Sequence, residues 1–456
     1  MAIKEFMVCG LEPIEQVLLP FQEFFKSKAT GGILLIICAG VALLWANSPW
    51  ADSYVTLWNT KFSVGFGQLS LSKPVILWVN DGLMALFFFV VGLEIKREFK
   101  VGELSTRSQA VLPIAAAIGG MIVPASIYAL INFGTESAGG WGIPMATDIA
   151  FALGILSLLG DRIPYQLKIF LTAVAIVDDL GGILVIALFY TSEISFWLLL
   201  AAGVLLLVAF AGNRMGIRTP VFYAVVGVLV WLTVLKSGVH STVAGVLMAF
   251  MIPARTKCDA AAFSFNASGI LEDYKASMRP GASVLSNSAM HSALLSMQYI
   301  ASRAQTPLQR LEHGLHPLVD FAVMPIFALA NAGVILGGDV GTVLSSEVAL
   351  GTAFGLVLGK PIGIVLAVLF IITVSGGVPR GVLIRHYVGA GMLGGIGFTM
   401  SLFIATLAFG DSPALLTGAK TAIIGASVIA GIAGYLVLRS APSTEELLKE
   451  QASQRG

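Results

Sequence analysis

Residues 168–190 read KIFLTAVAIVDDLGGILVIALFY, and two adjacent aspartates, Asp178 and Asp179, stand at the middle of this mostly apolar run. The run is long enough to cross the hydrocarbon core of a bilayer as a single α-helix. A carboxylate at that depth is costly, and charged residues there generally face a bundle interior or an ion pathway. The stretch therefore predicts a membrane-spanning helix with a polar site halfway along its length.

The composition of the whole chain fits the same environment. Of its 456 residues, 57% are hydrophobic and only 12% are charged, which excludes an ordinary soluble domain. The 50 glycines suit closely packed membrane helices, and the net charge of +1 gives no basic surface for nucleic acid. The three cysteines form no CxxC pair and predict neither a disulfide framework nor a metal site.

Apolar windows, divided at polar or Gly/Pro breaks, predict an all-α polytopic membrane protein with about twelve transmembrane helices. Of the 27 Lys and Arg residues, 22 fall in one alternate set of connections and only Lys61, Lys73 and Lys236 in the other, while Lys360 and Lys420 fall inside predicted spans. By the positive-inside rule, both termini are expected in the cytoplasm. The predicted spans are 30–46, 76–95, 109–133, 142–160, 167–190, 195–211, 219–235, 239–253, 316–336, 347–374, 387–409 and 415–437.

Two long connections stand out between the spans. In residues 51–74, apolar side chains alternate with small or polar ones around Gly65 and Gly67, which predicts an extracytoplasmic β-hairpin or, equally well, a plain surface loop. Residues 254–311 are rich in Ser and Ala and are predicted to be a partly disordered cytoplasmic loop. The chain accordingly divides into a cytoplasmic N-terminal segment (1–28) with a short interfacial helix over 12–26, a transmembrane domain (29–440) and a cytoplasmic tail (441–456).

Lys360, in GLVLGKPIGI, lies halfway along the tenth predicted span. It is the natural countercharge for one of the two aspartates, because both would lie near the bilayer midplane. A purely structural Asp178–Lys360 pair is the alternative. That alternative leaves the adjacent Asp179 unexplained.

Two predicted spans contain helix-breaking residues. The fourth reads GGWGIPMATDIAFALG and the eleventh GGIGFTMSLFIATLAFG. Non-helical backbone at membrane depth is tolerated only inside protein or along a wet cavity, and paired breaks in two halves point to a transporter site at the midplane. Thr147 and Thr399 either contact an ion directly or only satisfy freed backbone carbonyls. The other residues singled out at these breaks are Asp148, Gly395 and Gly397.

A second group of charges lies at the predicted cytoplasmic ends of two spans, in VGLEIKRE and RLEHGLHP. Histidine beside paired carboxylates is typical of a proton-responsive gate, and a solvated juxtamembrane surface is the alternative. The two histidines of HGLHP, with no cysteine near them, do not predict a zinc site. The group comprises Glu94, Arg97, Glu98, Glu312, His313 and His316.

Several stretches together resemble the NhaA sodium/proton antiporter family, from about residue 30 to residue 440. They are WVNDGLMALFFFVVGLEIKRE, ATDIAFALG, VAIVDDLGG, VLKSGVHST, RLEHGLHP, LGKPIGI and GGIGFTMSLFIA. The resemblance implies inverted-topology repeats that relate spans 3–5 to spans 10–12, with interrupted spans 4 and 11 crossing at the midplane.

The resemblance also implies roles for individual residues. Asp178 and Asp179 match the family's paired sodium- and proton-binding aspartates, Thr147 and Asp148 the unwound fourth helix, and Lys360 the lysine that balances charge at the crossing. The six residues of the charged group match positions associated with pH regulation. Asp81 and His240 match further positions linked to pH response or transport, although the sequence around His240 by itself favours a packed helix-end histidine over a titrating switch.

The activity implied is electrogenic exchange of two protons for one Na⁺ or Li⁺ by a homodimer in the bacterial inner membrane, activated at alkaline pH. Physically, two buried carboxylates with Thr147 and backbone carbonyls can hold either protons or a sodium ion, and that competition is antiport. Such a protein is a transporter rather than an enzyme and needs no cofactor. A sodium-coupled symporter of related fold is the alternative. Two features depart from the family pattern: the long 254–311 connection and an additional acid, Asp320.

Overall fold

The computed structural model describes residues 28–66, 69–191, 194–278, 284–335, 340–375 and 382–442. Within these ranges the chain is almost entirely helical, and the only strands are β1 (Lys61–Phe66) and β2 (Leu69–Pro74). The interfacial helix predicted over 12–26 and all of the predicted tail except Ala441 and Pro442 lie outside the described residues. The predicted all-α class is confirmed.

Seven helices among the described residues are long and apolar enough to cross a membrane. Three helix pairs pass the same test but bend at a short break, and two shorter helices are also apolar, α10 (Pro220–Leu235) and α11 (Thr242–Met251). Every predicted span overlaps one of these helices or pairs, while the count of about twelve crossings stays a prediction. The seven are Val75–Val101, Arg107–Ile131, Tyr165–Phe189, Phe196–Arg214, Pro307–Asn331, Glu347–Val374 and Pro413–Ser440.

The connection after the first span is partly helical, which the sequence did not predict. α2 (Lys28–Ala46) and α3 (Ala51–Asn59) meet at 112°. α3 buries Tyr54 and Trp58, and the Tyr54 hydroxyl donates to the carbonyl of Leu329 at 2.9 Å. The antiparallel hairpin follows over Lys61–Pro74 only, where Ser63 pairs with Ser72.

The described chain forms two compact units. The first comprises Met1–Phe87, Glu98–Ser192 and Val319–Gly456, and the second Phe88–Arg97 and Glu193–Leu318, so that α5 (Met84–Val101) contributes to both. Besides α2, α3 and the hairpin, the first unit contains α4 (Val75–Trp78), α6 (Arg107–Ile131), a 3₁₀ helix (Glu136–Met145), α7 (Ile149–Leu158), a 3₁₀ turn (Gly160–Arg162), α8 (Tyr165–Phe189), α15 (Met324–Asn331), α16 (Val340–Leu344), α17 (Glu347–Phe354), α18 (Lys360–Ser375), α19 (Ile384–Gly394), α20 (Phe398–Phe409) and α21 (Pro413–Ser440).

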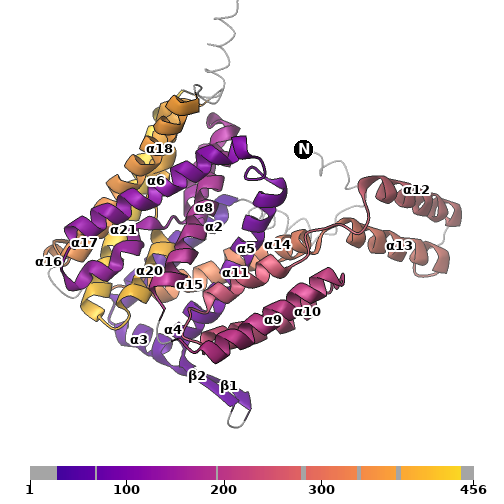
Figure 1. The fold of residues 1–456 in the computed structure, drawn as a ribbon, viewed down its shortest axis with the longest axis horizontal. Helices are drawn as coiled ribbons and strands as arrows, with labels where there is room; N and C mark the ends of the chain where they lie inside the picture. The colour runs from indigo at the N-terminus through magenta and orange to yellow at the C-terminus, as the bar shows by residue number, and fades with distance from the viewer. Residues whose placement is uncertain are drawn as a thin grey trace, which may run out of the picture. The chain divides into compact units, whose positions relative to one another are not determined.

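Glycines allow α6 and α18 of the first unit to approach each other closely. α6 and α18 run side by side (Figure 1). A Cβ on Gly119 would overlap the carbonyl oxygen of Gly363, and a Cβ on Gly363 would overlap that of Gly119. Such backbone contact between apolar helices requires small residues and brings the start of α18, where Lys360 lies, against α6.

Three π-helical turns interrupt helices of the first unit among the described residues: Val79–Leu83, Val319–Val323 and Gly355–Gly359. A π turn inserts an extra residue into a helix, and such turns are frequent at functional sites. Asp81 lies in the first turn, Asp320 in the second, and Lys360 follows the third directly. These turns could not be predicted from the sequence, because their composition is that of ordinary helix.

The second unit packs α9 (Phe196–Arg214), α10 and α11 with residues 88–97 of α5 and with α14 (Pro307–Leu318). Figure 1 shows α9 and α10 lying side by side. Their shared core is apolar throughout and consists of Leu93, Ala202, Ala209, Tyr223, Val226, Val230, Val234, Ala244, Met248, Ala249, Ile252 and Leu308.

The described part of the 254–311 connection contains two long helices, which were not predicted from the sequence. α12 (Ala260–Ser277) and α13 (Ser288–Ala304) form a helical pair. Both helices begin at a side-chain cap: Asp259 accepts from Ala262 N at 2.7 Å, and Asn287 accepts from Ala289 N at 3.1 Å. Ser- and Ala-rich sequence is compatible with helix once such caps satisfy the free N–H groups.

Candidate ion-binding site

The two interrupted helices meet at their breaks. The 3₁₀ helix Glu136–Met145 and α7 are bent by 43° around residues 146–148, and α19 and α20 are bent by 43° around residues 395–397. The backbone N–H of Asp148, at the first break, donates to the carbonyl of Ile396, at the second, over 2.7 Å. Each break therefore satisfies backbone groups that the other leaves free, as buried non-helical backbone requires.

Asp148 caps the N-termini of both continuing helices. Its Oδ1 accepts from Phe151 N in α7 at 3.0 Å, and its Oδ2 accepts from Thr399 N in α20 at 3.2 Å and from the Thr399 hydroxyl at 2.5 Å. Both side chains are fully buried. A carboxylate at a helix N-terminus is stabilised by the free N–H groups and the helix dipole, and Asp148 serves two such ends.

Gly395 and Gly397 leave room for this crossing. A Cβ on Gly395 would overlap the carbonyl oxygen of Leu356, and one on Gly397 would overlap the hydroxyl of Ser401. Ser401 in turn donates to the carbonyl of Ile143 at 2.8 Å. Glycine is required here by close packing rather than by an unusual backbone angle.

Asp178, halfway along α8, faces the crossing and pairs with Lys360. Its Oδ2 contacts the Lys360 ammonium and accepts from the Thr147 hydroxyl at 2.7 Å. Lys360 also donates to the carbonyl of Met145, at the end of the 3₁₀ helix. The exposed fractions of Asp178, Thr147 and Lys360 are 1%, 1% and 0%. The second oxygen of Asp178, Oδ1, is buried and has no hydrogen-bond partner.

Asp179 is also buried, with 6% of its surface exposed. Successive helical residues point about 100° apart, so α8 is covered on more than one face at this level. One neighbour is α6: a Cβ on Gly181 would overlap the sulfur of Met121. Gly182 makes no such approach, since a Cβ there would meet nothing within 4 Å.

The site offers more oxygen atoms than sequence reasoning identified. The Gly394 carbonyl lies 2.8 Å from the Thr147 hydroxyl, and the Met145 carbonyl contacts Lys360. Both are backbone groups freed by the helix breaks, so the Gly/Pro-rich sequence was their only signal. Hard cations such as Na⁺ prefer carboxylate, hydroxyl and carbonyl oxygens, all of which are present here.

In the second unit, α5 and α14 bring four of the predicted gating residues together. Glu94 Oε1 lies 2.9 Å from His316 Nε2, and Arg97 Nε lies 3.1 Å from Glu312 Oε1. Glu312 is only 3% exposed, while His316 and Arg97 remain about one-third exposed. We call these four residues the α5–α14 cluster.

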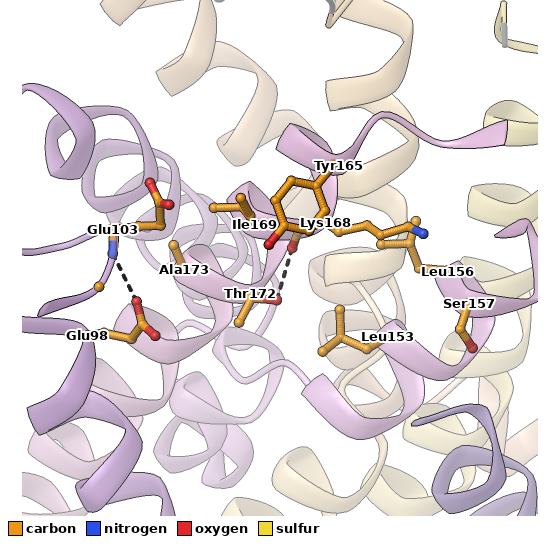
Figure 2. Close-up of a pocket in the computed structure, with 11 residues that line it drawn as sticks. Glu98, Glu103, Leu153, Leu156, Ser157, Tyr165, Lys168, Ile169, Thr172 and Ala173 are labelled. Carbon is orange, nitrogen blue, oxygen red and sulfur yellow. Dashed lines mark hydrogen bonds between the residues drawn. The ribbon is translucent and has the colours of Figure 1, made fainter. Parts of the chain in front are cut away.

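The other two members of the predicted gating group have different partners. The His313 ring lies 2.8 Å from the carbonyl of Gln309 and is exposed. Glu98 accepts from Glu103 N at 3.0 Å and lines a pocket of about 510 Å³ in the first unit (Figure 2). Thr172 of α8 lines the same pocket about two helical turns before Asp179, which puts both on one face of α8.

Three further predicted residues lie elsewhere. Asp81 pairs with Lys73 of the hairpin at 2.8 Å. The His240 ring lies 2.8 Å from the Thr242 hydroxyl at the start of α11, the environment of a packed helix-end histidine. Asp320 lies beside α2, because a Cβ added to Gly31 of that helix would be 3.8 Å from the Cβ of Asp320.

Sequence reasoning missed a buried amide pair beside Asp81. Asn331 Nδ2 donates to Asn80 Oδ1 at 2.9 Å, and both residues are buried. This bond joins the first π turn to the end of α15. Asn80 was visible as a polar residue inside WVNDG, but its partner lies too far along the chain to be inferred.

Comparison with known proteins agrees with this architecture. The family described as Na⁺/H⁺ antiporter 1 matches residues 22–438. The chain is 52% identical to the "Na(+)/H(+) antiporter NhaA" of Oleidesulfovibrio alaskensis over 94% of its length and 95% of the relative's. It is 48% identical to the protein of that name from Koribacter versatilis, over 95% and 94%. These relatives are named as transporters, not enzymes, and the chain belongs to the Na⁺/H⁺ antiporter 1 family of multi-pass bacterial membrane proteins.

Proposed function

We propose that this chain is an electrogenic Na⁺/H⁺ antiporter in which protons and Na⁺ compete for one site formed by Asp178 and Asp179. The observation that carries the proposal is the buried Asp178–Lys360 pair at the point where two interrupted helices meet. A buried ion pair gives little net stability, because desolvation of both charges offsets their attraction. Its retention beside a second buried carboxylate therefore favours a functional role.

Lys360 occupies the place that we assign to a sodium ion. Its ammonium contacts one carboxylate oxygen and the Met145 carbonyl, which are the kinds of ligand a sodium ion takes. When Lys360 moves away, these oxygens are left buried and short of positive charge. A Na⁺ held by Asp178, Asp179, Thr147 and backbone carbonyls restores the balance, whereas in the Na⁺-free state Lys360 and bound protons do so.

We assign a stoichiometry of two protons for each Na⁺ or Li⁺, so that one net charge crosses the membrane per cycle. One charge gains about 2.3 kcal/mol per 100 mV of membrane potential. That energy corresponds to about a 50-fold concentration ratio, because 1.36 kcal/mol is tenfold. An inside-negative potential can therefore drive Na⁺ extrusion even without a favourable pH gradient.

The remaining assignments concern setting and control. We place the protein in the bacterial inner membrane as a homodimer with both termini in the cytoplasm, as the distribution of Lys and Arg favours. We assign pH response to the α5–α14 cluster, together with Glu98, His313, Asp81 and His240. Histidine paired with a carboxylate changes charge near neutral pH, which such a switch needs. The sodium-coupled symporter is not favoured, because the relatives carry the name of antiporters.

The central test measures antiport in everted membrane vesicles from a host that lacks its own Na⁺/H⁺ antiporters. Addition of Na⁺ should dequench a ΔpH-sensitive dye with the native chain, and Asp179→Asn should abolish this response. Asp411→Asn, the same change at an exposed position, should retain it. Undiminished Na⁺-dependent dequenching by Asp179→Asn would refute the proposal.

Competition gives a second test in the same vesicles. Each proton that competes with Na⁺ should raise the apparent KM for Na⁺ about tenfold per pH unit on the acid side, by mass action. A KM for Na⁺ that is independent of pH would exclude a shared site. Lys360→Arg tests the lysine as a proton carrier: an unchanged proton/sodium ratio would exclude it, because arginine does not release its proton.

A further inference from the structure

Three side chains of the α5–α14 cluster are arranged as ligands for a metal ion. Glu94, Glu312 and His316 each offer one ligand atom, and these atoms lie within 4.8 Å of one another. Glu312 and His316 are four residues apart on α14, a spacing that places both on one helix face. Glu94 comes from α5, so two helices converge on one point.

A second observation is the environment of Glu312. Its side chain is only 4% exposed, and Arg97 takes one oxygen, Oε1, at 3.1 Å. The other oxygen, Oε2, is buried and has no hydrogen-bond partner. A buried carboxylate oxygen without a donor or cation is costly, since it has lost its hydration and gained nothing in return.

We propose that Glu94, Glu312 and His316 form a binding site for a divalent transition-metal ion of the Zn²⁺ class. One imidazole nitrogen and two carboxylate oxygens, with water in the fourth position, make up a three-ligand zinc site. Mg²⁺ and Ca²⁺ are disfavoured because they prefer all-oxygen sites. HGLHP alone contains too few ligands, and only the folded chain adds the carboxylate of Glu94.

The geometry requires a small closure of the side chains. Ligand atoms around a tetrahedral zinc ion lie about 3.3 Å apart, given metal–ligand distances of about 2.0–2.1 Å. The Glu94–His316 separation of 2.9 Å must open slightly, and any of the other separations above about 3.3 Å, all of which are within 4.8 Å, must shorten. Rotation within the two glutamate side chains is sufficient for both changes.

Arg97 has a definite place in this arrangement. It can keep Oε1 of Glu312 while the metal ion takes Oε2, so that the carboxylate bridges the guanidinium and the metal. Charged neighbours that contact a metal ligand in this way orient it and tune the affinity of the site. With the metal ion bound, its coordinate link replaces the Glu94–His316 ion pair and joins α5 to α14, while the Arg97–Glu312 pair is kept.

The test measures metal binding, not ion exchange, so a failure of the proposed antiport leaves it intact. The full chain, purified in detergent with its affinity tag removed, is freed of metal and titrated with Zn²⁺ against a chromophoric chelator. We expect each chain to bind one Zn²⁺ ion tightly. Glu312→Gln and His316→Ala should each weaken binding at least about 10–100-fold.

The matched control is His313→Ala, because His313 lies on the same helix but is exposed and bonded to Gln309. Its binding curve should equal that of the native chain. Equal Zn²⁺ affinity in His316→Ala and the native chain would overturn the site, and so would the absence of a tight equivalent in the native chain.

A gain-of-signal variant keeps the proposal testable if His316→Ala misfolds. In His316→Cys, Co²⁺ should show a thiolate-to-metal charge-transfer band that the native chain lacks, because the new sulfur replaces a ligand nitrogen. His313→Cys should show no such band. A band in His313→Cys but not in His316→Cys would also overturn the assignment.

Discussion

The Asp178–Lys360 pair and the Glu94–His316 pair are chemically similar but differ in their surroundings. The first is completely buried, with both side chains 0% exposed, and it lies against backbone freed by helix breaks. The second has side chains that are 20% and 37% exposed, and both stand on regular helix. Burial decides what each pair can do, because a buried charge must be replaced by another charge, whereas an exposed one can turn to water.

The first pair is thus suited to obligatory exchange of one cation for another. The second is suited to graded adjustment, since solvent competes with each partner. The following predictions test this contrast, beginning with the largest expected effect.

Lys360→Met leaves Asp178 buried and unpaired, and we expect the unfolding free energy to fall by about 3–5 kcal/mol. Equilibrium unfolding in mixed detergent micelles measures the change. Lys73→Met is the matched control, because the Lys73–Asp81 pair is 27% and 15% exposed and should cost at most about 1 kcal/mol. Equal losses of unfolding free energy in the two variants would contradict the distinction between buried and exposed pairs.

Asp148→Ala removes the caps of both α7 and α20, and we expect a loss of about 1–4 kcal/mol, at about 0.5–2 kcal/mol for each cap. Asp148→Asn keeps one acceptor oxygen and should lose less. The comparison outside the crossing is Asp259→Ala, which removes the single cap of α12. If both alanine variants lost the same amount in micelle unfolding, Asp148 would not be a double cap.

Gly119→Ala places a methyl group against the carbonyl of Gly363 and should destabilise the chain by about 1–3 kcal/mol through overpacking. Gly269→Ala, in the interior of α12, meets nothing within 4 Å and should stabilise it by up to about 1 kcal/mol, because alanine favours helix. The expected result is that the two variants change the unfolding free energy in opposite directions. A stabilising Gly119→Ala would contradict the close α6–α18 contact.

Glu94→Gln should have the smallest effect, at most about 1 kcal/mol, since its pair with His316 is partly exposed. The same unfolding assay applies, with the His313→Ala variant as a baseline for an exposed change on α14. A loss of unfolding free energy as large as that of Lys360→Met would show that the Glu94–His316 pair is as strongly desolvated as the Asp178–Lys360 pair.

Much of the architecture could be predicted from the sequence, because a bilayer imposes strict rules. Each predicted span overlaps an apolar helix or bent pair, and both interrupted spans bend where Gly and Pro gather before Thr147 and Thr399. The helix α3, the three π turns and the ordered α12–α13 pair were not predicted. These elements depend on packing or capping partners and not on an apolar period.

The residues of the candidate site and the pairing of Lys360 with one of its aspartates were predicted, but its other contacts were not. The acidic pair, Lys360 and the two threonines stand out because charged or polar side chains are rare in apolar runs. Their partners do not: nothing local indicates that Asp148 caps α20, or that the carbonyl of Met145 receives Lys360. Glu98 and His313 share motifs with the cluster, and each bonds to a backbone group that their motifs did not indicate, Glu103 N and the carbonyl of Gln309.

By itself the sequence determined the environment of the chain, the positions of its spans and the identity of the buried charges, because hydrocarbon admits polar groups only where something compensates them. Only the tertiary structure decided which oxygen meets which cation, and that Glu94 completes a ligand set with Glu312 and His316. The physical reason is that hydrogen bonds and ion pairs act over about 3 Å, a distance that folding alone sets between residues far apart in the chain.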